Sequence, residues 1–329
     1  MSTATPRAVE VVALGCADPR APIGDDVMRS GPERMALRLM SRSAVLAYHA
    51  AREALAGAAW PDLTEAGLFM AVGASGSDLE QLRRILLASQ GERGFTLARF
   101  GEQGLRVCNP LFAFQLMNNF TMAHTAILTG TRGPNAVLFS RGVGTLAALD
   151  EALAALRHGD CARALVGAAD SAVHPVTALE HTRWHGELAD APAGEGAAVL
   201  ALAAVDPRAG APEPGAGPSR WHIASVEWSE GGAPRPGAPS RAALGIADDD
   251  AVVLHGWRAD VAAELATALA GRAAPAVSVL SLPDCLAATA PLAWAEALSR
   301  APATCHALAV VTADRDGGVG AVRFVRGAR

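Results

Sequence analysis

Residues 131–170 constrain the fold more than any other stretch of the chain, because they form the pattern of one complete βαβ unit. A turn leads into a short apolar run at 136–139, which predicts a buried strand. Residues 145–157 then carry apolar side chains at helical spacing among good helix formers. Gly159 ends that helix, and the apolar run at 164–169 predicts a strand buried on both faces of a parallel sheet.

The strand and the helix of this unit are joined by a glycine-rich elbow, Ser140-Arg141-Gly142-Val143-Gly144. Ligands and nucleophiles usually lie where a parallel strand ends and a helix begins. The surrounding motifs resemble those of the β-ketoacyl synthases, condensing enzymes of the thiolase superfamily. That family has an Arg-Gly-Pro-Asn turn before the strand and an Arg-Arg-Gly-Asp turn after the helix. It also has a later Gly-Glu-Gly-Ala-Gly-Val-Leu strand, which the segment beginning at Gly194 resembles closely.

The resemblance places the family's nucleophilic cysteine on Gly142. Counting forward from Asn135 and counting back from Asp160 give the same position. Glycine has no side chain, so covalent thioester catalysis cannot run from it. The chain therefore resembles a ketosynthase that has lost its nucleophile.

The other catalytic positions of the family are largely replaced. Of its two histidines, the first corresponds to His255, and the second falls on Asp284, which also suits a plain helix N-cap. Trp257 stands where the family has a threonine that contacts the pantetheine arm, and the glycine-rich gate at 314–320 lacks its phenylalanine. Ser140 and Cys285 are the remaining candidates for a nucleophile. Ser140 lacks the spacing of a nucleophile elbow. Cys285 is expected near a helix start that could lower the pKa of its thiol, but the carboxylate of the neighbouring Asp284 acts in the opposite direction.

The resemblance implies an α/β thiolase-like fold, with two duplicated βαβαβ halves in a layered αβαβα sandwich. Residues 206–219 are dense in Pro, Gly and Ala and predict a linker. The linker separates a half at 1–205, which carries the degenerate elbow, from a shortened half at 220–329.

Further elements follow from periodicity. Apolar runs predict strands at 10–17 and 67–76, and helical spacing predicts helices at 32–58 and 78–90. Residues 171–193 predict a polar loop whose histidines lie at the surface without a metal ligand set: His174, His181 and His185.

Helices are also expected across 109–130, with Asn118 and Asn119 in the middle. In the family this region lies beside the dimer interface. An ordinary core helix has the same apolar spacing, so both interpretations stay open.

Composition excludes several functions. The 329 residues are 51% apolar with a net charge of −5, which indicates a large core and no basic face for nucleic acid. Neither a secretory signal nor a membrane span is expected, so a cytoplasmic location is predicted. The five cysteines have no paired spacing, and no disulfide, metal or cofactor is expected.

Three hypotheses result. The first is a non-condensing subunit similar to the chain length factors, a dimer partner of an active ketosynthase in polyketide, aryl polyene or specialised fatty-acid biosynthesis. The second is a repurposed decarboxylase, cyclase or acyltransferase that uses His255 on chains bound to acyl carrier protein. The third is a homodimeric scaffold that binds acyl carrier protein. The residues expected at the dimer interface or tunnel wall are Asn118, Asn119, Phe139, Ser140 and Arg141.

Overall fold

The computed structural model describes most of the chain. The described residues are 7–21, 23, 33–37, 39–74, 79–140, 142–185, 192–205, 220–231, 239–270 and 277–327. The expected linker at 206–219 and the elbow residue Arg141 lie outside them.

Five strands of the first half form a mixed sheet in the order β5-β2-β6-β7-β1. Strand β2 runs parallel to β5 and β6, while β7 is antiparallel to both β6 and β1. The strands are β1 (Ala8–Ala17), β2 (Gly67–Val72), β5 (Asn135–Phe139), β6 (Arg163–Ser171) and β7 (Glu195–Val205).

The second half repeats this arrangement in the order β10-β9-β11-β12-β8, with the same parallel and antiparallel pairs. The two halves join through two residue pairs between β1 and β8, Glu10 with His222 and Val11 with Trp221. The duplication is therefore confirmed, and the ten strands form one hydrogen-bonded series. The strands are β8 (Trp221–Ser229), β9 (Ala251–Gly256), β10 (Val277–Val279), β11 (Ala307–Ala313) and β12 (Val319–Arg326).

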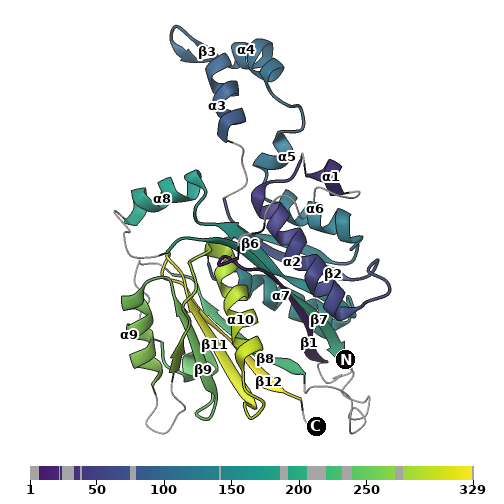
Figure 1. Cartoon of the computed structure of the whole chain (residues 1–329), viewed down its shortest axis with the longest axis vertical. Coiled ribbons are helices and arrows are strands. Elements are labelled where there is room, and N and C mark those ends of the chain that lie inside the picture. Colours follow the sequence, from purple (N-terminus) through teal and green to yellow (C-terminus); the bar gives the residue numbers. More distant parts are fainter. Residues whose placement is uncertain are drawn as a thin grey trace.

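Helices complete the layers of the sandwich. Helices α7 (Gly144–His158) and α10 (Thr289–Arg300) lie between the two halves and pack against strands of both in the largest apolar core. Helices α2 (Arg42–Ala58) and α6 (Phe120–Thr129) cover the outer face of the first half. Helix α9 (Ala259–Leu269) covers the outer face of the second half, which completes the αβαβα order (Figure 1).

Residues 79–107 form an arm that projects from the body of the molecule (Figure 1). It consists of α3 (Leu79–Ala88), the β3–β4 hairpin (Gln90–Gly91 and Gly94–Phe95), α4 (Leu97–Arg99), a π-helical turn (Phe100–Gly104) and a 3-10 turn (Leu105–Val107). The remaining short helices and turns are α1 (Glu33–Ala36), α5 (Ala113–Leu116), α8 (Pro175–His185), Ala242–Leu244 and Leu286–Ala288.

Three local expectations were wrong. The helix expected over 32–58 is broken before α2, because the Ser41 hydroxyl accepts the Ala44 N–H at 3.2 Å and caps a new helix. The loop expected over 171–193 contains α8. The strand expected to be buried at 136–139 is only partly buried, because β5 lies at the edge of the sheet and pairs with β2 alone.

None of the helices in the described part of the chain is long and apolar enough to cross a membrane.

Candidate functional site

The elbow meets two segments of the second half at the carboxyl ends of the strands. Strands β9 and β11 end side by side, with Thr312 opposite His255 in register. The 314–318 loop, which joins β11 to β12, reaches the start of α7, where the Val143 N–H donates to Asp314 Oδ2 at 3.0 Å. Thr145 in α7 donates to the carbonyl of Ala287, in the turn before α10, at 2.7 Å. The elbow, the 314–318 loop and this turn therefore form one site.

Ser140 stabilises the elbow itself. Its hydroxyl oxygen accepts the N–H groups of Gly142 at 3.2 Å and Gly144 at 3.0 Å. These are backbone donors at the start of a helix, which have no partner within the helix. Ser140 thus acts as a cap, and its predicted place at an interface or tunnel wall stays a prediction.

Gly142 has no room for a side chain, because the Asp314 side chain fills the space. A Cβ atom built on Gly142 would lie 2.1 Å from both Cβ and Oδ2 of Asp314. The carboxylate is held there, since its Oδ1 accepts the N–H groups of Asp316 at 3.0 Å and Gly318 at 2.7 Å. A cysteine at position 142 would therefore require the 314–318 loop to move.

Burial dominates the charge state of Asp314. Burial raises the pKa of its carboxyl, and the three backbone N–H donors only partly offset this effect. The family resemblance indicated only that this loop lacks the gate phenylalanine. The signal for Asp314 was an aspartate that opens a short Asp-Arg-Asp-Gly-Gly turn, a pattern in which the carboxylate often accepts N–H groups of its own turn.

His255 is buried, with 1% of its surface exposed, and its Nε2 lies 3.1 Å from the carbonyl oxygen of Leu282. A carbonyl can only accept, so Nε2 carries the proton and Nδ1 is the bare nitrogen. Within the described residues Nδ1 has no hydrogen-bond partner. Burial lowers the pKa of His255, so the ring is neutral near pH 7.

Asp284, at the expected position of the second histidine, forms a buried ion pair with Arg315. Arg315 Nε pairs with Asp284 Oδ2, and both side chains are almost fully buried. The other oxygen, Oδ1, accepts the Leu286 N–H at 2.9 Å and the Thr289 hydroxyl at 3.0 Å. Asp284 therefore caps the turn before α10, as its helix-cap interpretation predicted, but the sequence showed nothing of the partner Arg315.

Gly142, His255 and Asp284 are brought together around the 314–318 loop. Asp314 faces Gly142, the next residue Arg315 binds Asp284, and His255 lies on the strand beside β11. Two consecutive side chains of this loop thus contact the two positions at which the family's catalytic residues were expected to be missing. Asp314 fills the space beside Gly142, and Arg315 forms an ion pair with Asp284.

Cys285 does not have the properties of a nucleophile. It is fully buried, and burial, followed by the nearby Asp284 carboxylate, raises the pKa of its thiol. The helix start does not lower the pKa of this thiol, because the thiol lies inside the core, and the opposing effect expected from Asp284 adds to that of burial.

The other predicted residues that the structure describes belong to the first half and are exposed or half-buried. Phe139 ends the edge strand β5 and is 64% exposed. Asn119 is exposed at the start of α6, and its neighbour Asn118 is half-buried.

The described residues contain no group of His, Cys, Asp or Glu side chains that could hold a metal ion. His174 accepts the Val176 N–H at 3.3 Å through Nδ1, a local contact at the start of α8. The side chains of His181 and His185 lie outside the described residues.

Comparison with known families and structures gives one consistent result. Residues 9–202, more than half of the chain, match the family model of the β-ketoacyl synthase N-terminal domain. No curated protein matches the chain in sequence.

Solved structures match the whole chain at low identity. A type II polyketide synthase acyl carrier protein in complex with its ketosynthase (AntDE:AntF) matches with a TM-score of 0.71 and 16% identity, over 97% of this chain and 99% of the other. The ishigamide ketosynthase/chain length factor matches with a TM-score of 0.68 and 18% identity, over 98% of this chain and 100% of the other. A β-ketoacyl synthase from Burkholderia phymatum matches with a TM-score of 0.70 and 16% identity, over 98% of this chain and 100% of the other. At these identities the likeness establishes the thiolase-like fold.

Proposed function

Since the chain belongs to the β-ketoacyl synthase family, we propose that it is a non-condensing ketosynthase-like subunit. It pairs with an active β-ketoacyl-ACP synthase in polyketide, aryl polyene or specialised fatty-acid biosynthesis. Its role resembles that of a chain length factor, which shapes the growing chain without forming the carbon–carbon bond.

The observation that carries this proposal is the filled space at Gly142. A condensing enzyme of this family needs a thiol at this position to hold the acyl group. Here the residue has no side chain, and Asp314 occupies the volume into which one would project. The chain therefore lacks the thiol, and a second residue, Asp314, also fills the space that the thiol would need.

The other two positions support the same conclusion. The Asp284 carboxylate forms an ion pair with Arg315 and accepts the Leu286 N–H in the turn before α10. It therefore cannot replace a histidine that stabilises an enolate. The Nε2–H group of His255 donates a hydrogen bond to the Leu282 carbonyl, so this donor is not available to a substrate oxygen.

Pairing with a second subunit is consistent with three strongly exposed apolar side chains of the first half. Leu97 on the arm, Ile127 on α6 and Phe139 on β5 are 78%, 74% and 64% exposed. A partner that covered such side chains would remove their apolar surface from water. One matched structure is a ketosynthase/chain length factor, and another holds an acyl carrier protein with its ketosynthase. A ketosynthase and an acyl carrier protein are the partners proposed here.

The test is co-expression with a ketosynthase encoded beside its gene, followed by affinity capture and size exclusion. The proposal predicts one co-eluting complex that contains both chains. A chain that elutes alone as a monomer, while the ketosynthase forms its own dimer, would refute it.

His255 leaves a second candidate, a repurposed catalyst acting on chains bound to acyl carrier protein. The observation in its favour is the bare, unpartnered Nδ1, which could accept a proton. Replacing His255 with glutamine should abolish product formation by the intact pathway if this candidate is correct. Unchanged product from a correctly folded variant would exclude it. For the third candidate, a homodimeric scaffold, capture of acyl carrier protein without any ketosynthase is the distinguishing result.

A further inference from the structure

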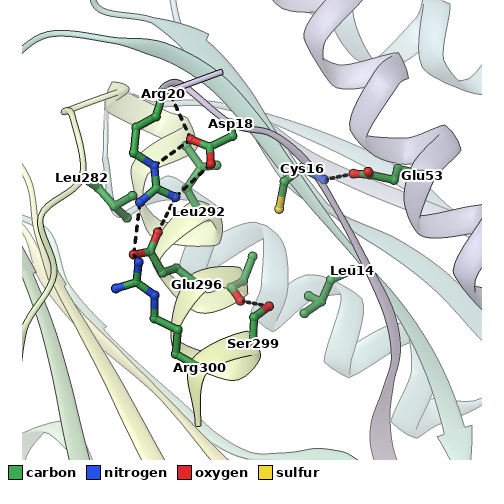
Figure 2. A pocket seen from close by; sticks show the side chains of 11 residues that line it. Leu14, Cys16, Asp18, Arg20, Glu53, Leu282, Leu292, Glu296, Ser299 and Arg300 are labelled. Atoms are coloured by element: carbon green, nitrogen blue, oxygen red, sulfur yellow. Dashed lines mark hydrogen bonds and ion pairs between the residues drawn. The ribbon is translucent and has the colours of Figure 1, made fainter. Parts of the chain in front are cut away.

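A pocket lies beside the seam of the sheet, where the two halves part. Strand β1 pairs with β8 only at Glu10 and Val11, and beyond Val11 it continues with α10 as its neighbour on this side. We call this site the seam pocket; its volume is about 390 Å³ (Figure 2). Its lining comes from the end of β1 and the residues that follow it, from Glu53 in α2, and from α10 with the segment before it.

One wall of the seam pocket is a row of alternating charges that neutralise one another. Arg20 lies between Asp18 and Glu296, with N–O distances of 2.9 Å and 2.7 Å. Arg300 binds the same Glu296 at 2.9 Å (Figure 2). Two guanidinium groups and two carboxylates leave this wall with no net charge.

Glu53, on the far side of Cys16 in Figure 2, carries a charge that this row does not compensate. Glu53 is exposed to solvent, and its Oε2 accepts the Cys16 N–H at 2.6 Å, which holds the carboxylate beside the pocket. No basic side chain of the described residues forms an ion pair with it. The thiol of Cys16 remains protonated, because burial and then the Glu53 charge raise its pKa to about 12.

Three leucines also line the seam pocket: Leu14 from β1, Leu282 from the segment before α10, and Leu292 from α10. The seam pocket thus combines one negative charge held at Cys16 with apolar side chains and a row of ion pairs that is neutral overall. Its volume lies at the small end of the range for ligand sites.

We propose that the seam pocket binds a small hydrophobic ammonium compound. Its ammonium group lies at the Glu53 carboxylate, and its hydrocarbon part packs against Leu14, Leu282 and Leu292. A charge-assisted hydrogen bond to a positioned carboxylate supplies the polar contact, and burial of the hydrocarbon supplies the rest. A carboxylate ligand would face the net negative charge of the lining. This inference goes beyond the proposed function, because it uses no side chain of the elbow.

Calorimetric titration of the full chain with n-hexylammonium chloride, with 1-hexanol and with sodium hexanoate tests the proposal. The ammonium probe should bind saturably, and the alcohol and the carboxylate should bind at least about tenfold more weakly, because a hydrogen bond to a charged group is lost. Glu53→Gln keeps an acceptor for the Cys16 N–H but removes the charge, so it should weaken the ammonium probe about tenfold. Glu65→Gln, at an exposed glutamate outside the pocket, should leave binding unchanged.

Arg300→Ala provides a change of opposite sign. Arg300 is 67% exposed, and its loss leaves Glu296 paired with Arg20. The lining then becomes more negative, so the ammonium probe should bind a few-fold more tightly. Three results would each overturn the proposal. The first is hexanoate binding more tightly than the ammonium probe, with Arg300→Ala abolishing that binding. The second is unchanged affinity of Glu53→Gln for the ammonium probe, and the third is no saturable binding of this probe by the folded protein. Circular dichroism melting curves establish that each variant is folded.

Discussion

Asp314 stands 2.1 Å from the point where a Cβ atom on Gly142 would lie, although 171 residues of chain separate the elbow from the carboxylate it binds. The contact joins the start of α7 in one half to the end of β11 in the other. The position at which the nucleophile was expected therefore contacts the loop at which the gate was expected, and the side chain of Asp314 fills the space beside Gly142.

A side chain at position 142 should destabilise the fold. Gly142→Ala forces its Cβ into Asp314 and should lower the free energy of unfolding by about 3 kcal/mol, the cost of overpacking a tight site. Denaturant unfolding measures this change. Gly101→Ala is the matched control, because a Cβ at Gly101 meets nothing within 4 Å. Equal stability of the two variants would contradict the close approach of Asp314.

The effect should depend on residue 314. Asp314→Ala keeps the Cβ that a side chain at 142 would strike, whereas Asp314→Gly removes it. We expect Gly142→Ala combined with Asp314→Gly to be more stable than the sum of the single changes by about 2 kcal/mol. Asp314→Ala should give much less rescue. Strict additivity in both double variants would show that the two positions do not interact.

The buried pair of Asp284 and Arg315 should tolerate the loss of both charges better than the loss of one. Asp284→Ala leaves Arg315 unpaired in the core and should cost about 3–5 kcal/mol. Asp284→Leu with Arg315→Met should cost much less, since no uncompensated charge remains. Urea unfolding of the three proteins makes the comparison. Glu80→Ala, which breaks an exposed ion pair with Arg83, should leave the unfolding midpoint unchanged. A single Asp284 variant as stable as the wild type would mean that the pair is not buried.

Stability should fall as the pH is lowered through about 6.5, in part because of His255. Burial holds the folded-state pKa of His255 below its model value of 6.5, so below that pH the unfolded chain binds a proton that the folded chain does not. His49 and His124 shift in the same direction. His255→Gln can still donate to the Leu282 carbonyl but does not titrate, so its stability should fall less steeply with decreasing pH. Unfolding curves between about pH 7.5 and about pH 5.5 measure the two slopes. If stability changed equally steeply with pH in the wild type and in His255→Gln, His255 would be exposed to solvent rather than buried.

The exposed end of β5 should matter for pairing more than its counterpart in the second half. Strand β10 holds the same edge position as β5, and Val279 ends it with 53% exposure, as Phe139 ends β5. Phe139→Glu should prevent co-elution with the ketosynthase, because it places a charge in an apolar contact. Val279→Glu should leave co-elution intact. If both variants co-elute equally well, β5 is not at the interface.

The sequence predicted the elements that depend on local signals. Helix α7 and strands β5 and β6 follow from periodicity and from the glycine that ends α7, and counting between two turns was enough to place Gly142 on the elbow. Ser41 is itself a capping signal, so the break before α2 was readable from the chain. Helix α8 was missed because its residues show little apolar periodicity.

The contacts that close the site were not readable in this way. Asp314 reaches Val143 across 171 residues, and Arg315 reaches Asp284 across 31 residues. Nothing in the neighbouring sequence of either residue indicates its partner. Pairing of this kind is set by how the two halves pack around α7 and α10, so it requires the tertiary structure.

Incubation with an acyl thioester of an acyl carrier protein, followed by intact-mass spectrometry, tests the central claim most directly. The co-purified complex is used, so that the active ketosynthase serves as an internal control. The account predicts an acyl adduct on the ketosynthase alone, with the mass of this chain unchanged. A stoichiometric adduct on this chain that hydroxylamine removes, whether at Ser140, at Cys285 or at any other residue, would contradict it.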